Sequence, residues 1–139
     1  MKQWTHHRLH ALASALILTE VMFIGCTKPT DTIEVTGTVT WDGVPLDTGS
    51  IRFMPTDPRI APAGSTIVDG AYKLRIKPGP ARVEIEATRL TDKIDPIEKA
   101  RLSEAFIPAR YNRDSELSAD VTRDGENRFD FSLSPTADR

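Results

Sequence analysis

IEVTGTVTW, residues 33–41, alternates apolar and polar side chains along its whole length. Its apolar side consists of Ile33, Val35, Gly37, Val39 and Trp41. Because successive side chains of a strand point to opposite faces, this period of two predicts a strand with one face buried. DGVP, residues 42–45, supplies turn chemistry, and residues 50–54 resume the alternation with Ile51 and Phe53. We therefore expect residues 33–41 and 50–54 to pair as a first hairpin.

The middle of the chain repeats this pattern. Asp69-Gly70 separates residues 66–68 from the alternating segment 71–76, and this dipeptide is a strong hairpin signal. Pro78-Gly79-Pro80 ends that strand, and residues 82–88 begin another with Val83, Ile85 and Ala87 facing inward. A register with Ile76 opposite Val83 would place Arg75 beside Glu84 and Lys73 beside Glu86. We expect a second hairpin about Asp69-Gly70 and a third about Pro78-Gly79.

Two segments interrupt the strands. Residues 55–65 contain three prolines and a glycine and predict a loop. Residues 89–107 break the alternation, and Asp95-Pro96 followed by Glu98 fits a helix N-terminus. This insertion is therefore a short helix within residues 95–106 or an irregular loop.

Alternation returns in residues 117–121 and 129–133, on either side of Asp124-Gly125-Glu126, which predicts a last hairpin. The pattern amounts to about seven short strands with frequent turns. It predicts an all-β fold, a seven-stranded antiparallel β-sandwich over residues 33–134, followed by a polar tail at residues 135–139.

The start of the chain is typical of a secretion signal. Lys2 and Arg8 precede an apolar stretch over residues 11–25, which ends in Phe23-Ile24-Gly25-Cys26. This layout matches a bacterial lipobox, so we expect residues 1–25 to be a lipoprotein signal peptide forming a helix. Cys26 would then carry a covalent lipid, and residues 26–32 would tether the domain to the membrane. A conventional cleaved signal and an uncleaved anchor are the alternatives.

Composition bears on the chemistry open to this chain of 139 residues. His6, His7 and His10 are its only histidines and Cys26 its only cysteine, so the chain beyond Cys26 has no imidazole and no thiol. Because most hydrolytic active sites use an imidazole or a thiol, we expect that this protein is not an enzyme. Catalysis by carboxylates alone is the alternative from that class. Removal of residues 1–25 changes the formal charge from −2 to −3. The sequence has no basic patch with interleaved aromatic residues, so it does not predict nucleic-acid binding.

Metal binding has little support in the spacing of acidic residues. Asp42, Asp47, Asp57 and Asp69 are oxygen ligands of the kind that calcium prefers. Their spacing matches no calcium loop, and we expect neither a metal site nor a cofactor other than the lipid on Cys26.

The segments VTGTV (35–39), DGVPL (42–46) and GSIRF (49–53) resemble the opening of carboxypeptidase regulatory-like domains of the transthyretin-like superfamily. DGAY (69–72), Pro78-Gly79 and IPARYN (107–112) are similar to small planctomycete-type lipoproteins that carry this domain. The likeness covers residues 35–133 and implies a seven-stranded sandwich without a catalytic role of its own. The related hydroxyisourate hydrolases rely on histidines and a C-terminal Tyr-Arg-Gly-Ser, and this chain has neither.

The resemblance places family turns and corners at Gly37, Gly43, Pro45, Leu46, Gly49, Asp69, Gly70, Tyr72, Gly79, Pro108, Arg110, Tyr111 and Asn112. At Gly37 the missing side chain would admit a neighbour, with Trp41 and Tyr111 as candidates. Arg110-Tyr111-Asn112 is a recognition surface or a structural corner. In the corner, the Tyr111 hydroxyl would cap a backbone group and Asn112 would bond its own turn.

These observations predict a non-enzymatic lipoprotein of the bacterial cell envelope, held on the membrane by its lipid and facing the periplasm or the exterior. It would act as a binding or structural module for an envelope protein or glycan. The alternative is an accessory or carrier subunit that binds glycan or a metal ion through residues 55–65 and 89–107.

Overall fold

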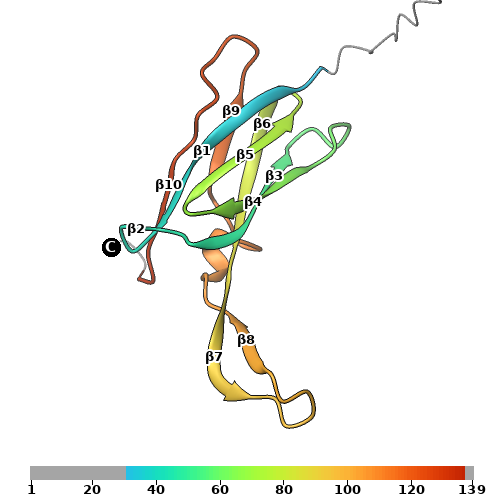
Figure 1. The fold of residues 1–139 in the computed structure, drawn as a ribbon. Helices are drawn as coiled ribbons and strands as arrows, with labels where there is room; N and C mark the ends of the chain where they lie inside the picture. The colour runs from blue at the N-terminus through green and yellow to red at the C-terminus, as the bar shows by residue number, and fades with distance from the viewer. Residues whose placement is uncertain (1–30, 137–139) are drawn as a thin grey trace, which may run out of the picture.

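A computed structural model describes residues 31–136 and contains a curved sheet with a two-stranded arm below it (Figure 1). The strands are β1 (Ile33–Trp41), β2 (Val44–Pro45), β3 (Thr48–Pro55), β4 (Ala63–Val68), β5 (Ala71–Ile76), β6 (Gly79–Glu86), β7 (Thr88–Ile94), β8 (Arg101–Ala105), β9 (Ser118–Val121) and β10 (Phe131–Leu133). One 3-10 turn, η1 (Ala109–Tyr111), is the only helical element in this part of the chain. The all-β prediction is confirmed, and the signal helix falls on residues outside those described.

The main sheet has the strand order β10-β1-β5-β4-β3-β6-β9, with β2 paired to β1. Its neighbours run antiparallel except β1 and β10, which are parallel, with Val39 opposite Phe131 and Trp41 opposite Leu133. The expectation of a wholly antiparallel sheet is therefore wrong at this edge.

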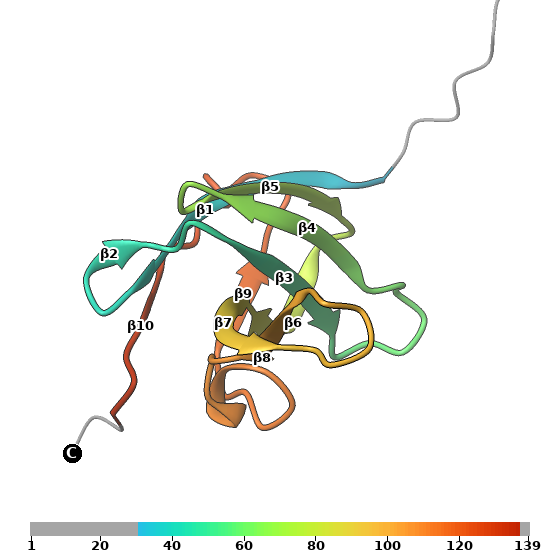
Figure 2. The ribbon, with the colours of Figure 1, turned by 60° about the horizontal axis from the view of Figure 1, so that its bottom comes forward.

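A short link forces the sheet to curl. β5 and β6 are joined by Lys77 and Pro78 alone, although β4 and β3 lie between them in the sheet. Three interstrand steps in a flat sheet span about 14 Å, whereas three Cα steps reach at most about 11 Å. The sheet bends into a half-barrel, which brings the end of β5 to the start of β6 (Figure 2).

The inward faces of the strands fill the core of this half-barrel. β1 contributes Val35 and Val39, both fully buried, as the alternation of residues 33–41 predicts. The side chains of Val83, Ile85 and Ala87 also face inward, as predicted. The largest fully buried side chains are Phe53, Ile51, Ile67, Ile85, Leu133, Val35, Val39, Val83 and Val121. Period two thus identifies the buried face of the strands correctly.

Only one of the four predicted hairpins forms. β4 and β5 meet about Asp69-Gly70, with Val68 opposite Ala71, so the second hairpin is confirmed. The first is wrong, because β1 pairs with β5 while β3 pairs with β4 and β6. The last is also wrong: β9 pairs with β6 and β10 with β1, at opposite ends of the strand order.

The predicted charge pairs between residues 71–76 and 82–88 are wrong for the same reason, since β5 and β6 are not neighbours. Lys73 pairs instead with Glu34 across the β1–β5 ladder, at 3.0 Å. Glu84 lies between Arg52 at 3.7 Å and Arg82 at 2.7 Å. Cross-strand pairing of opposite charges does occur, but with partners that the chain order does not reveal.

Residues 89–107 form neither the expected helix nor an irregular loop. β7 and β8 pair antiparallel from Thr88 opposite Ala105 to Ile94 opposite Arg101, with a bulge between Leu90 and Ile94. The N-terminal helix signal at Asp95 is nevertheless real, because its carboxylate accepts hydrogen bonds from the amides of Ile97 and Glu98, both at 2.7 Å. The Lys99 amide donates to the Asp95 carbonyl, which is the only helix-type bond of this turn. Lys99 has a positive φ of 56°, which ends the turn, and the chain returns as β8.

Candidate functional site

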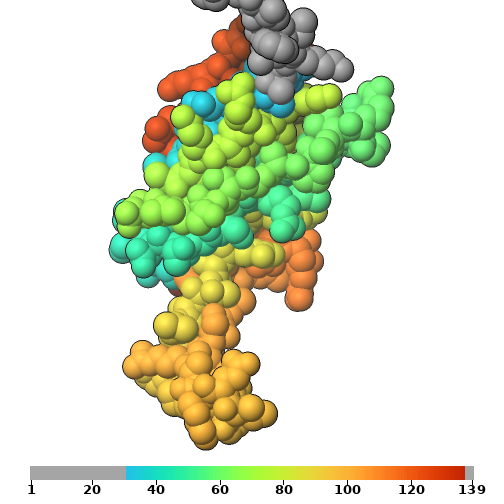
Figure 3. Space-filling view, turned by 45° about the vertical axis from the view of Figure 1, so that its right-hand side comes forward, coloured from blue at the N-terminus to red at the C-terminus, as the bar shows by residue number. Residues whose placement is uncertain are grey.

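The β7–β8 arm is the part of the described chain that is most exposed to solvent. It stands clear of the body in the space-filling view (Figure 3), and every residue of β8 is exposed. Four aliphatic side chains project from it: Ile97 is 88% exposed, Leu90 67%, Ile94 54% and Leu102 40%. Two-stranded ribbons are marginally stable alone, and four of the six large apolar side chains that are exposed in the described residues lie on this one. The arm is therefore the candidate functional site.

The tip of the arm is held by its own turn. Asp95 donates its amide to the Ala100 carbonyl and accepts the Lys99 amide with its own carbonyl. Hydrogen bonds from the Glu98 and Ile97 amides to its carboxylate hold the pKa of Asp95 below its usual range. Ile97 sits in this turn, so the most exposed apolar side chain lies on a backbone of defined geometry.

Ion pairs flank the apolar side chains along the arm. Arg89 binds Glu104 directly across the two strands, with nitrogen–oxygen distances of 2.9 and 3.0 Å. Arg101 lies 3.9 Å from Asp92. The arm as a whole, residues 88–105, carries four cationic and four anionic side chains, so its net charge is zero.

Aromatic contacts fasten the arm to the body. Phe106 packs edge-on against Trp41 of β1, with ring centroids 5.4 Å apart. The Arg89 guanidinium lies over the Phe106 ring, 5.5 Å from its centre. The Phe106 amide donates to the Ala87 carbonyl at 3.3 Å and so continues the β7–β8 ladder to the sheet.

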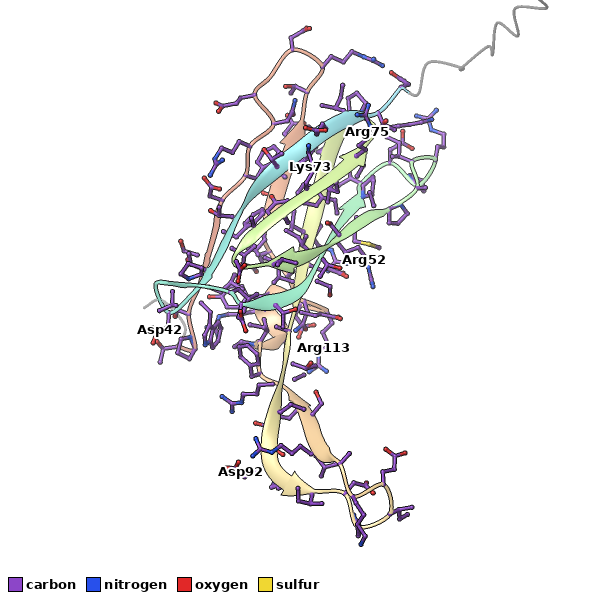
Figure 4. The ribbon with its side chains drawn as sticks, viewed as in Figure 1. Asp42, Arg52, Lys73, Arg75, Asp92 and Arg113 are labelled. Atoms are coloured by element: carbon purple, nitrogen blue, oxygen red, sulfur yellow. The ribbon has the colours of Figure 1, made fainter. Side chains whose placement is uncertain are left out.

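A hollow of about 500 Å³ lies at the base of the arm. Ala105 and Thr88 of the arm line it together with Ile107 and Ala109. Its rim includes Glu86 and Arg113, and Figure 4 places Arg113 beside the arm root, with Asp92 farther along the arm. Within the described residues, Arg113 forms an ion pair only with the adjacent Asp114, with 3.4 Å between Nε and Oδ2.

The segment Pro108–Asn112 is a structural corner, as one of the two interpretations predicts. The Tyr111 hydroxyl accepts the Ser134 amide at 3.1 Å, and Asn112 donates to the carbonyls of Ile107 and Pro108. The Arg110 guanidinium stacks over the Tyr111 ring at 4.6 Å and donates to the carbonyls of Ser134 and Thr136. The corner thus clamps the chain after β10.

Gly37 admits a backbone group, but the neighbours differ from Trp41 and Tyr111. A side chain there would overlap the Phe129 carbonyl and approach the Tyr72 hydroxyl to 2.8 Å. Tyr72 donates to the same carbonyl at 2.7 Å. Burial of this hydroxyl raises the pKa of Tyr72 well above its usual range. Gly37 and Tyr72 therefore hold the segment before β10 against β1.

The remaining positions that the resemblance singles out lie in or next to turns. Asp42-Gly43 and Asp69-Gly70 all have positive φ, the conformation that such turns require. Leu46 donates its amide to Val39 and accepts the amide of Gly70. Pro45 packs within 2.8 Å of where a Gly70 side chain would begin, and Gly49 lies against the Glu86 carbonyl. Gly79 starts β6 with a φ of +139°.

The acidic side chains of the described residues are not gathered into a metal site. In residues 31–136 no group of three or more potential ligand side chains is placed to hold an ion. Asp42 lies at the edge of the body in Figure 4, and Asp57 binds Arg59 in the β3–β4 loop. That loop and the arm lie toward opposite ends of the molecule (Figure 1), so residues 55–65 and 89–107 do not form one site.

Sequence reasoning missed Leu90, Ile94, Ile97 and Leu102 as surface residues. The available signal was the turn chemistry of Asp95-Pro96 between two five- to seven-residue segments that lack prolines. A turn of this kind indicates a hairpin as well as a helix start.

The predicted lipidation site, Cys26, lies outside the described residues. Among residues 31–136, no helix combines the length and apolar character needed to cross a bilayer. Comparison of the chain with protein-family models, with curated proteins and with solved structures gave no match.

Proposed function

We propose that this protein is a non-enzymatic lipoprotein of the bacterial cell envelope, anchored through a lipid on Cys26, whose β-body presents the β7–β8 arm as its contact element. We further propose kinship with carboxypeptidase regulatory-like domains, in which the curled sheet corresponds to the two faces of their sandwich. The exposed arm is the observation that carries the binding role.

The placement of the arm supports this function. The start of β1, next to the first described residues, lies at the end of the body opposite the arm (Figure 1). Arg123 pairs with Asp31 at 2.5 Å, and Arg75 donates to the Thr32 carbonyl at 3.0 Å, so the first described residues are bound to the body. A lipid on Cys26 would hold this end at the membrane and direct the arm away from it.

Mass spectrometry of the native protein from the membrane fraction tests the anchor. The expected result is an N-terminal fragment beginning at an acylated Cys26, and a Cys26→Ala chain that leaves the membrane fraction. An unmodified residue 26 in membrane-bound protein would reject the anchor. Titration with envelope glycans and with calcium, followed by Trp41 fluorescence, tests the carrier alternative, for which a saturable change is required.

A further inference from the structure

We propose that the arm pairs with the arm of a second copy of this chain, β8 against β8, to form a four-stranded sheet about a two-fold axis. The inference rests on the proposed contact role of the arm and names its partner.

The open side of β8 carries backbone groups ready for this pairing. The Phe106 amide points to Ala87, and the Leu102 carbonyl accepts the Thr91 hydroxyl, so these two residues turn their backbone groups toward β7. Because backbone groups alternate along a strand, Arg101, Ser103 and Ala105 direct theirs to the open side. β8 therefore presents three donor and acceptor pairs on a regular edge.

The two edges of the arm differ in their protection. β7 carries the bulge between Leu90 and Ile94, and bulges are a common means of blunting a free edge. β8 has no bulge and no proline, and all five of its residues are exposed. An unprotected edge of this kind is a template for another strand, so β8 is the pairing edge.

One register uses the whole edge. With Ser103 opposite Ser103 of the second copy, Arg101 lies opposite Ala105 and all outward backbone groups find partners. Leu102 then lies opposite Glu104, and no two like charges face each other. The zero net charge of the arm removes the repulsion that a charged arm would have toward its own copy.

The same register carries the tip of each arm to the base of the other. Ala100 comes beside Phe106 of the second copy, so Ile97 approaches the hollow lined by Ala105, Ile107 and Ala109. The tip brings Glu98 and Lys99 toward the rim, where Arg113 and Glu86 have the opposite charges. This complementarity between tip and hollow favours a second copy over an unrelated strand.

Substitution of Ser103 tests the pairing in the full chain, purified in a mild detergent. Ser103→Pro removes an amide that points away from β7, so the hairpin keeps its own ladder. Sedimentation should give a dimer for the parent chain and for the matched control Ser103→Ala, and at least tenfold weaker association for Ser103→Pro. A monomeric parent chain over the micromolar range, or equal association of both variants, would overturn the inference.

Crosslinking tests the register. Chains with Leu102→Cys mixed with chains with Glu104→Cys should form a mixed disulfide dimer on oxidation, since these positions face each other about 4.5 Å apart between Cα atoms. Thr66→Cys, on the outer face of β4, replaces Glu104→Cys in the control mixture. Equal yields in both mixtures would reject the register.

The outcomes separate this inference from the proposed function. A monomeric full chain with an acylated Cys26 would overturn the pairing and leave the anchor proposal standing. A dimer with an unmodified Cys26 would support the pairing and overturn the anchor proposal.

Discussion

A single methyl group at position 37 would take the space that the Phe129 carbonyl now fills. Gly37→Ala should therefore lower the free energy of unfolding by about 1–3 kcal/mol, the usual cost of overpacking. Denaturant unfolding of the full chain measures this. Gly43→Ala is the control, because nothing lies near its added methyl group and only the positive φ opposes it. An unchanged free energy of unfolding for Gly37→Ala would show that the close approach at Gly37 has no energetic weight.

Asp130 links the segment before β10 to β1 through its carboxylate. The Thr38 hydroxyl and amide both donate to it at 2.8 Å, and the hydroxyl is the main reason that the pKa of Asp130 lies below its usual range. Arg128, at 3.1 Å, acts in the same direction. The folded protein thus binds this proton more weakly than the unfolded chain does.

The stabilisation from Asp130 is complete above the unfolded pKa of about 3.9 and is lost as the pH falls through the lower folded value. Asp130→Asn should make the melting temperature less dependent on pH between pH 6 and pH 2, with the two chains converging at the acid end. Asp47→Asn is the control, since its side chain accepts no hydrogen bond from the described residues. A parallel pair of curves for Asp130→Asn and the parent would contradict this role.

At the scale of elements, the arm is expected to open independently of the body. Its strands bury little, whereas the sheet strands share one core, so local opening should cost far less than global unfolding. Asp95→Ala removes both hydrogen bonds that the carboxylate accepts at the tip.

Amide hydrogen exchange at low protein concentration measures this opening. Asp95→Ala should raise the exchange rates of β7 and β8 amides several-fold and leave those of β1, β3 and β6 unchanged. Glu116→Ala, at an exposed position outside the arm, is the control. Faster exchange throughout the body would show that the arm is part of one cooperative unit.

At the scale of the molecule, the anchor proposal fixes which end of the body faces the membrane. Seven Cα-to-Cα steps separate Cys26 from Ile33 and span at most about 25 Å, so the start of β1 would stay near the lipid. The arm projects from the opposite end (Figure 1).

Fluorescent probes on the lipidated chain in vesicles test this orientation. A probe at Lys77, which adjoins Asp31, should be quenched by quencher-labelled headgroups, and a probe at Ile97 should not. Vesicles without the quencher provide the control. Equal quenching at both positions would contradict the proposed orientation.

The sequence alone determined the buried faces of the strands that form the main sheet. The alternation about Val35 and Val39 places these side chains inward because the period of a strand is a local property. The turns at Asp42-Gly43 and Asp69-Gly70 were also predictable, because few residues tolerate their positive φ. The Tyr111 corner was one of two predicted outcomes.

Only the tertiary structure decided which strands pair. Any strand with one apolar face can join a sheet beside any other, so alternation does not distinguish β5 from β3 as the neighbour of β1. The two-residue link from β5 to β6 is explained only by the tertiary structure, in which the sheet bends around its core and brings the two strand ends together. The arm was unpredictable for the same reason: a hairpin turn and a helix start share the chemistry of Asp95, and the partner strand decides between them.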